Sequence, residues 1–214
     1  MFNFCLVMKR ISFFFAVVLF SFPVFGAKNI DFVDIGELDR TIVFDIRYAT
    51  PNNFTGMTIY PAARCLLRRD AALRLLHVQE KLERKGYRLI VFDCYRPLSV
   101  QKRFWEIMPD ERYVADPAKG SRHNRGAAVD VSLADAEGKP LPMPTVYDDF
   151  SEKAHRDYKG ASPEALKNSA ILEAAMKEEG FEPFPTEWWH FDAPGWDQYP
   201  VSDFPLKRAG GCED

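Results

Sequence analysis

The sequence predicts an α+β fold in a single domain, running from about Asn29 to Lys207. The 214 residues are 47% hydrophobic and 28% charged, which is typical of a globular chain with one buried core. Strand-like and helix-like segments mix without the regular alternation that builds a parallel sheet. No repeat or Gly/Ser linker divides the chain. This composition excludes a coiled coil or a disordered tail, and the net charge of −3 argues against a nucleic-acid partner.

The first strand and the first helix are predicted from hydrophobic periodicity. Thr41–Tyr48 has the composition of a strand, and Ala49–Gly56 has that of a turn. Leucine recurs at helical spacing through Cys65–Lys85, and Gly86 is a typical helix stop.

The remaining elements follow from the same patterns. Ser162 and Pro163 are a typical start for the last helix, because Ser caps helices and Pro is favoured at the first helical position. The predicted strands are Tyr87–Asp93, Ala127–Leu133 and Glu187–Asp192, and the predicted helices are Leu98–Ile107 and Pro163–Glu179.

The first 26 residues have the three parts of a secretory signal. Lys9 and Arg10 precede the uncharged apolar run Ile11–Phe25, and small residues lie at the spacing that signal peptidase reads. The alternative is a retained membrane anchor, but a spanning helix needs about 20 apolar residues. We therefore expect a signal peptide over residues 1–26, a mature domain over residues 27–214 without a stable membrane anchor, and export, most simply to the periplasm.

Export would place three cysteines in an oxidising compartment. They allow one internal bridge, and Cys65 with Cys94 is the favoured pair because Cys212 lies in a polar tail that we expect to fray. The alternative is three free thiols. No two cysteines have the spacing of zinc ligands.

Two histidines and one aspartate could form a hydrolytic metal site, which needs three protein ligands and an open position for water. His123 lies in SRHNRGAAVD and His190 in EWWH. Asp130 lies in an apolar strand, where a carboxylate needs a strong partner. A metal is one such partner, and a salt bridge to Arg122 or Arg125 is the alternative.

Glu187 precedes His190 by three residues, so the two lie close if this segment turns and less directly if it is a plain strand. A carboxylate beside an activated water can take its proton and pass it to a leaving amine. In the alternative interpretation Trp188 and Trp189 are core residues, and Glu187 and His190 are surface residues.

Arg96 follows a predicted strand and precedes Pro97, which disfavours helical geometry at Arg96. A planar guanidinium held in this way suits an oxyanion or a carboxylate. A surface ion pair is the alternative role.

Together these segments resemble a known family. The pattern SxHxxGxAxD at residues 121–130, followed by EWWH at residues 187–190, resembles the zinc D-alanyl-D-alanine dipeptidases of the vancomycin-resistance type. Further matches are YAT at 48–50, NFTG at 53–56 and YRP at 95–97, and the resemblance extends from about Asp45 to Pro205. It implies the D,D-peptidase or hedgehog-like fold, with a mainly antiparallel central sheet flanked by helices.

The resemblance also implies roles for the residues of the possible metal site. His123, Asp130 and His190 match the ligands of one Zn²⁺ ion. Glu187 matches the general base and acid, and Arg96 matches the arginine that stabilises the tetrahedral transition state.

Three further residues match positions near the substrate. Asp148 matches the carboxylate that holds the substrate's ammonium group, with Asp149 as a neighbouring competitor. Ser121 and Tyr60 match groups near the substrate's carboxylate or backbone.

The implied activity is hydrolysis of the small-molecule substrate D-Ala-D-Ala to two D-alanines. Since an exported enzyme meets dipeptide released from the cell wall, turnover or salvage fits better than resistance. The alternatives are a D,D-carboxypeptidase that trims longer peptidoglycan stem peptides and a non-catalytic wall-binding module. The sequence leaves the oligomeric state open.

Overall fold

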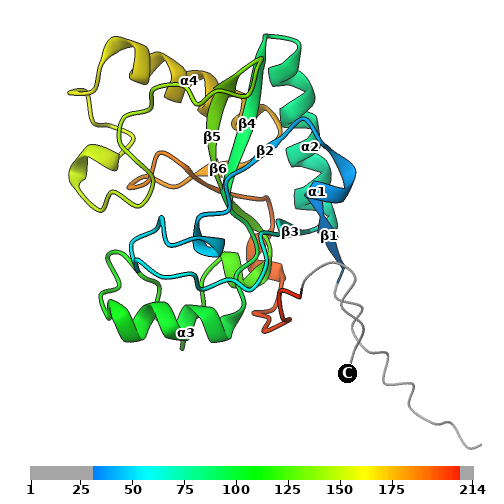
Figure 1. Ribbon diagram of the computed structural model, residues 1–214, viewed down its shortest axis with the longest axis vertical. Helices are drawn as coiled ribbons and strands as arrows, with labels where there is room; N and C mark the ends of the chain where they lie inside the picture. Colours follow the sequence, from blue (N-terminus) through cyan, green and yellow to red (C-terminus); the bar gives the residue numbers. More distant parts are fainter. Residues whose placement is uncertain (1–30, 208–214) are drawn as a thin grey trace, which may run out of the picture. The chain divides into compact units, whose positions relative to one another are not determined.

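A five-stranded sheet forms the centre of the fold (Figure 1). The computed structural model describes residues 31–207, so the predicted signal peptide and Cys212 lie outside the described residues. Only one strand pair of this sheet is parallel, β2 with β4, and the other three are antiparallel. The predicted α+β fold with a mainly antiparallel sheet is therefore confirmed. In spatial order the strands are β2 (Val43–Phe44), β4 (Tyr87–Asp93), β5 (Ala128–Asp135), β7 (His190–Asp192) and β6 (Glu182–Pro183).

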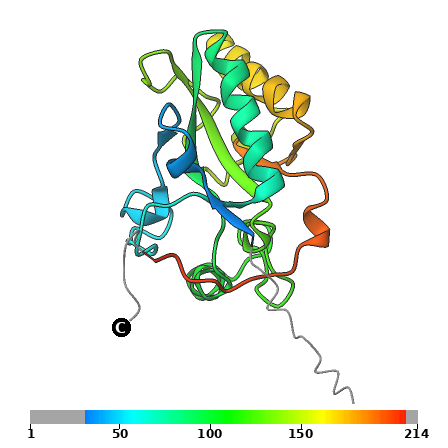
Figure 2. The same cartoon turned by 90° about the vertical axis from the view of Figure 1, so that its right-hand side faces the viewer.

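The two long helices, α2 (Arg69–Glu83) and α4 (Pro163–Glu178), lie side by side on one face of the sheet (Figure 2). Lys81 of α2 joins them through an ion pair with Glu178, at 3.2 Å. The shorter helix α3 (Leu98–Ile107) lies at one end of the sheet (Figure 1). A separate two-stranded sheet consists of β1 (Phe32–Asp34) and β3 (Leu66–Arg68), and the short helix α1 (Ile35–Leu38) follows β1.

The core forms where α2 packs on the central strands. Leu75 and Leu82 of α2 and Val91, Val129 and Leu133 of the sheet are fully buried. Each such side chain stabilises the fold by about 1.5–3 kcal/mol. The central strands are therefore a rigid base for side chains at their ends.

Several predicted elements are confirmed with their bounds. The strand Tyr87–Asp93 and the helix Leu98–Ile107 are found as predicted. The last helix starts at Pro163, and the side chain of Ser162 accepts a hydrogen bond from the backbone N–H of Ala165. Sequence patterns suffice here because capping and periodicity are local properties.

Three predicted elements are wrong in extent. Of the predicted helix Cys65–Lys85, the first residues form strand β3, which pairs with β1. Of the predicted strand Thr41–Tyr48, only Val43–Phe44 is a strand, and a 3-10 turn follows at Arg47–Ala49. The predicted strand Glu187–Asp192 begins only at His190, so Glu187 lies on a turn. At β3, the pairing with β1 overrides the local helical pattern.

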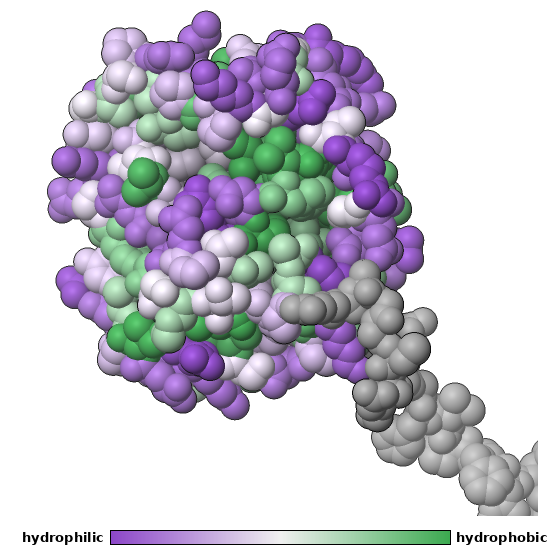
Figure 3. Space-filling model, viewed as in Figure 1, coloured by the Kyte–Doolittle hydropathy of each residue, from purple (hydrophilic) through white to green (hydrophobic). Residues whose placement is uncertain are grey.

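Hydrophilic side chains cover most of the face seen in Figure 3, with an apolar area over β2 and β4. Within residues 31–207, none of the helices has the length and hydrophobicity to cross a membrane.

The favoured disulfide is present. Cys65 and Cys94 are bonded, with their Cα atoms 5.1 Å apart. Cys65 immediately precedes β3, and Cys94 immediately follows β4. The bond therefore fixes the small sheet to the end of a central strand.

Replacing both Cys65 and Cys94 by Ala should reduce the free energy of unfolding by about 3–4 kcal/mol, because the bridge closes a loop with a sequence separation of 29. Urea denaturation measures this loss. Adding a reductant should destabilise the parent protein by a similar amount and leave the double variant unchanged. A parent protein that is insensitive to reductant would contradict the prediction.

Candidate active site

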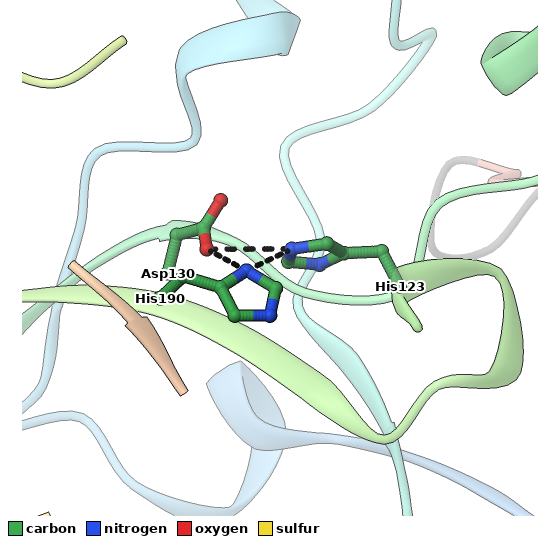
Figure 4. Close-up of side chains that lie close together, drawn as sticks. All are labelled: His123, Asp130 and His190. Carbon is green, nitrogen blue, oxygen red and sulfur yellow. Dashed lines mark hydrogen bonds and ion pairs between the residues drawn. The ribbon is translucent and has the colours of Figure 1, made fainter. Parts of the chain in front are cut away.

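Three side chains from separate segments point toward one another (Figure 4). His123 Nε2 and His190 Nδ1 lie 3.3 and 3.0 Å from Asp130 Oδ1, and 3.1 Å from each other. All three residues are buried. Asp130 and His190 are directly opposite each other in the β5–β7 ladder, so sheet register alone brings these two together. The predicted ligand set is therefore assembled by the fold.

His123 reaches this point because of the turn that precedes β5. It begins a 3-10 turn, His123–Arg125, that ends at Gly126, whose φ is +69°. A Cβ atom at Gly126 would lie 2.2 Å from the ring of Phe32, so both the backbone and the packing require glycine here. Ser121 supports the same turn, since its hydroxyl accepts from the backbone N–H of His123 at 3.2 Å.

Each of the three side chains has an outer partner that fixes its orientation. His123 Nδ1 lies 2.7 Å from the carbonyl oxygen of Cys94, and His190 Nε2 lies 3.0 Å from Asp192 Oδ1. Asp130 Oδ2 accepts from the hydroxyl of Tyr147 at 2.8 Å. When each imidazole donates to its outer partner, its other nitrogen presents a lone pair inward, as in protein metal sites.

Three inward lone pairs in a buried space repel one another unless a positive charge lies between them. Burial by itself lowers the pKa of His190, but its hydrogen bonds with Asp130 and Asp192 outweigh this effect and raise the pKa. Burial by itself raises the pKa of Asp130, but His123 and His190 lower it strongly. The site therefore attracts a cation, and two imidazoles with one carboxylate fit a divalent metal ion.

Glu187 lies beside this cluster because its segment turns. Its Oε2 atom is 3.7 Å from His190 Nδ1. The side chain is 24% exposed, and burial raises its pKa. A carboxyl group with a raised pKa can both accept and return a proton near neutral pH.

Arg96 is locked in place by two neighbours. Its Nη2 atom donates to Asp93 Oδ2 at 2.6 Å, and its Nη1 atom donates to Gln101 Oε1 at 2.9 Å. Its guanidinium also lies over the ring of Phe104, 4.8 Å from the centroid. Burial by itself lowers the pKa of Arg96, but the Asp93 carboxylate raises it above its ordinary value. Arg96 is thus a permanent, fixed cation.

Tyr60 does not line the cavity that holds the other predicted residues. It is buried, and its hydroxyl donates to Asp93 Oδ1 at 2.7 Å. The structure therefore corrects its expected place beside the substrate: Tyr60 lies behind Arg96 and contacts Asp93, which also binds Arg96.

Asp148 has a backbone φ of +61°, the only positive value for a non-glycine residue among residues 31–207. Such backbone costs about 1–3 kcal/mol and is common at functional sites. The hydroxyl of Tyr48 lies 3.2 Å from both carboxylate oxygens. Burial, and then the charge of Asp130, raise the pKa of Asp148 to about 8. Asp149 does not line the cavity, and its Oδ1 atom accepts from the backbone of Ser151.

Most of the predicted site residues line one cavity of about 290 Å³, and Tyr60 and Asp149 do not. Phe54, Phe104 and Phe150 form its apolar wall. The predicted residues that line it are Arg96, Ser121, His123, Asp130, Asp148, Glu187 and His190.

Sequence reasoning missed the residues that orient these groups. Tyr48 and Tyr147 connect Asp148 with Asp130, since their hydroxyls lie 3.4 Å apart. The sequence pattern indicates Asp93 only as the end of a strand. The available signal was position, because Tyr48 lies within the matched segment YAT, and Asp93 and Tyr147 lie close to matched residues.

A buried three-ligand centre beside a carboxyl group and a fixed guanidinium defines a metal-dependent peptidase with a single metal site. Comparison with known proteins agrees: the model of the D-Ala-D-Ala dipeptidase family matches residues 28–205, and the chain belongs to this family.

Several curated relatives cover most of the chain. The D-alanyl-D-alanine dipeptidase of Escherichia coli K12 is 36% identical over 171 residues, which are 80% of this chain and 89% of the relative. That of Enterococcus faecium is 30% identical over 205 residues, covering 84% of this chain and 100% of the relative. That of Streptomyces coelicolor is 30% identical over 203 residues, covering 82% and 98%.

Replacing Asp148 by Asn should increase stability in a pH-dependent way. The folded metal-free protein holds a proton on Asp148 up to pH about 8, whereas the unfolded chain releases it near pH 4. The parent therefore loses stability from this group as the pH rises from about 4 to 8. The stability advantage of the variant over the parent should grow through this window and then level off, as measured by urea denaturation at several pH values.

Asp149→Asn is the matched control. A difference in stability between Asp148→Asn and the parent that does not depend on pH would contradict the raised pKa of Asp148.

Proposed function

We propose that this protein is a zinc-dependent dipeptidase that hydrolyses free D-Ala-D-Ala to two D-alanines. The single observation that carries the proposal is the small cavity in which the buried metal-type cluster, Arg96, Glu187 and the carboxyl of Asp148 all face the same space. A zwitterionic dipeptide presents a carbonyl and an ammonium group to such a surface. The names of the curated relatives support the same substrate.

Zinc is the proposed ion because it accepts two imidazoles and one carboxylate and leaves a position open in catalytic sites. When bound, it supplies Lewis acidity toward the scissile carbonyl and toward water. His123, Asp130 and His190 would hold it, and their outer partners keep the ligand atoms oriented.

The chain's own residues carry the proton and charge movements. Glu187 accepts a proton from the attacking water as the water oxygen bonds to the carbonyl carbon. Negative charge then develops on the carbonyl oxygen, and the fixed guanidinium of Arg96 stabilises it. As the C–N bond breaks, Glu187 returns the proton to the leaving amine.

Asp148 provides selectivity for the free amino group. An ammonium group pairs with its carboxylate, whereas an amine blocked by acylation or by further residues leaves that carboxylate without its ionic partner. Ser121 lies on the same cavity and is the proposed contact for the substrate's backbone or carboxylate. The pocket therefore favours a dipeptide over a longer stem peptide.

We also propose that the enzyme works outside the cytoplasm, in cell-wall turnover or salvage. The signal-like residues 1–26 support this proposal. So does the Cys65–Cys94 disulfide, since such bonds persist in oxidising compartments. Expression of the full chain followed by fractionation should recover a periplasmic protein that begins at Ala27, as read by N-terminal sequencing. Recovery of an uncleaved membrane-bound chain would favour the retained anchor.

The purified, zinc-loaded protein should release D-alanine from free D-Ala-D-Ala and at least a hundredfold more slowly from N-acetyl-D-Ala-D-Ala. Faster release from the acetylated peptide would make it a D,D-carboxypeptidase, and release from neither substrate with zinc bound would favour a wall-binding module. Each result is read from a D-alanine assay.

Two variants control this experiment. Glu187→Ala should keep one zinc per chain and lose turnover, because Glu187 is a proton carrier and not a ligand. His190→Ala should lose both, as measured by metal analysis. Near-parental turnover by Glu187→Ala would overturn its assignment as the base.

A further inference from the structure

The turn that carries Glu187 has little regular structure of its own. It connects β6, which has two residues, to β7, which has three. Within it, Phe184 N–H donates to His190 O at 3.1 Å, and Glu187 N–H donates to Phe184 O at a long 3.4 Å. So short a hairpin is weak by itself. Catalysis nevertheless requires the Glu187 carboxyl at a fixed place beside the cluster.

One side chain from another segment closes this turn at its base. Arg156 Nε donates to the carbonyl of Phe184 at 2.7 Å, and Arg156 Nη2 donates to the carbonyl of His190 at 2.8 Å. These two carbonyls are the two ends of the turn. The backbone of the same segment adds two bonds, from Arg156 N–H to Pro185 O and from Trp188 N–H to Ala154 O, each at 3.0 Å.

The guanidinium of Arg156 is itself held on its other sides. Its Nη1 atom donates to Glu173 Oε2 of α4 at 3.1 Å. Its plane lies over the ring of Phe191, 4.3 Å from the centroid. Arg156 does not line the active cavity. It lines a separate cavity between α4 and residues 144–159. It therefore acts from behind the turn, without access to the substrate.

We propose that Arg156 is a positioning residue for the hydrolytic reaction, which fixes Glu187 and His190 relative to each other by binding the carbonyls at both ends of their turn. This inference rests on the proposed role of Glu187. A planar guanidinium reaches three acceptors in fixed directions, namely two carbonyls and one carboxylate. A lysine ammonium is a single point charge and cannot span them.

Arg156→Gln and Arg156→Lys test the proposal in the zinc-loaded full chain. We expect kcat for free D-Ala-D-Ala to fall 10- to 100-fold at full zinc occupancy, since small displacements of a catalytic group have effects of this size. KM should stay within about threefold, because Asp148 lies on another segment. Lysine keeps the positive charge but lacks the planar group with several donors. If Arg156→Lys does not restore kcat, the fixed directions of the hydrogen bonds matter, and the charge alone is not sufficient.

Arg74→Gln is the matched control. Arg74 Nη1 also donates to one backbone carbonyl, that of Glu179 at 2.8 Å, but Arg74 is on α2 and does not line the active cavity. Its kcat should stay within about twofold of the parent. A general loss of stability would affect both variants and would leave kcat per zinc-loaded molecule unchanged.

Hydrogen–deuterium exchange provides a readout that needs no substrate. The amides of Phe184 and Trp188 should exchange at least tenfold faster in Arg156→Gln than in the parent, and at the parental rate in Arg74→Gln. If Arg156→Gln fails to fold, Arg156→Lys decides the result.

Two outcomes separate this inference from the proposed function. Parental kcat, or unchanged exchange of the turn, in the Arg156 variants would overturn the role of Arg156. A parent protein that binds zinc but does not cleave D-Ala-D-Ala would overturn the proposed function, while the exchange data would still show whether Arg156 holds the turn.

Discussion

The close approach of three buried, inward-facing polar atoms is the constraint on which the rest of the site depends. His123 Nε2, Asp130 Oδ1 and His190 Nδ1 lie 3.0–3.3 Å from one another in a buried place. Without outer partners, an imidazole ring would be free to rotate away from this cluster. Here the Cys94 carbonyl and the Asp192 carboxylate hold the two rings from outside, so the cluster keeps its affinity for a cation.

The same supports also connect the cluster to the fold. Cys94 offers its carbonyl to His123 and its sulfur to Cys65, so the disulfide and the ligand are anchored at one residue. Asp93, one residue earlier, binds Arg96. The end of β4 therefore positions a ligand and the guanidinium together. Loss of the disulfide should for this reason disturb the site as well as the stability of the chain.

The sequence predicted what depends on local pattern. The motif around His123 and Asp130 and the complete span of β4 could be read directly. The turn at Glu187 could not, because the aromatic segment EWWH looks like a strand, and the bonds from Arg156 that shape the turn come from 28 and 34 residues away. Tyr147 was missed for the same reason: its role depends on a contact with Asp130 across 17 residues.

Asp148, in the wall of the cavity, reduces the stability of the free protein although the proposed function requires it. Asp148 has left-handed backbone and a carboxyl group whose ionisation is disfavoured by burial and by Asp130, and both features cost stability. The ammonium group of a bound dipeptide would reverse the second effect, since an adjacent cation favours the ionised carboxylate. Under the proposed function, this cost in the free protein would provide selectivity, because a ligand with a free amine recovers it and a ligand with a blocked amine does not. A fold with long central strands and a disulfide beside the site can tolerate that cost.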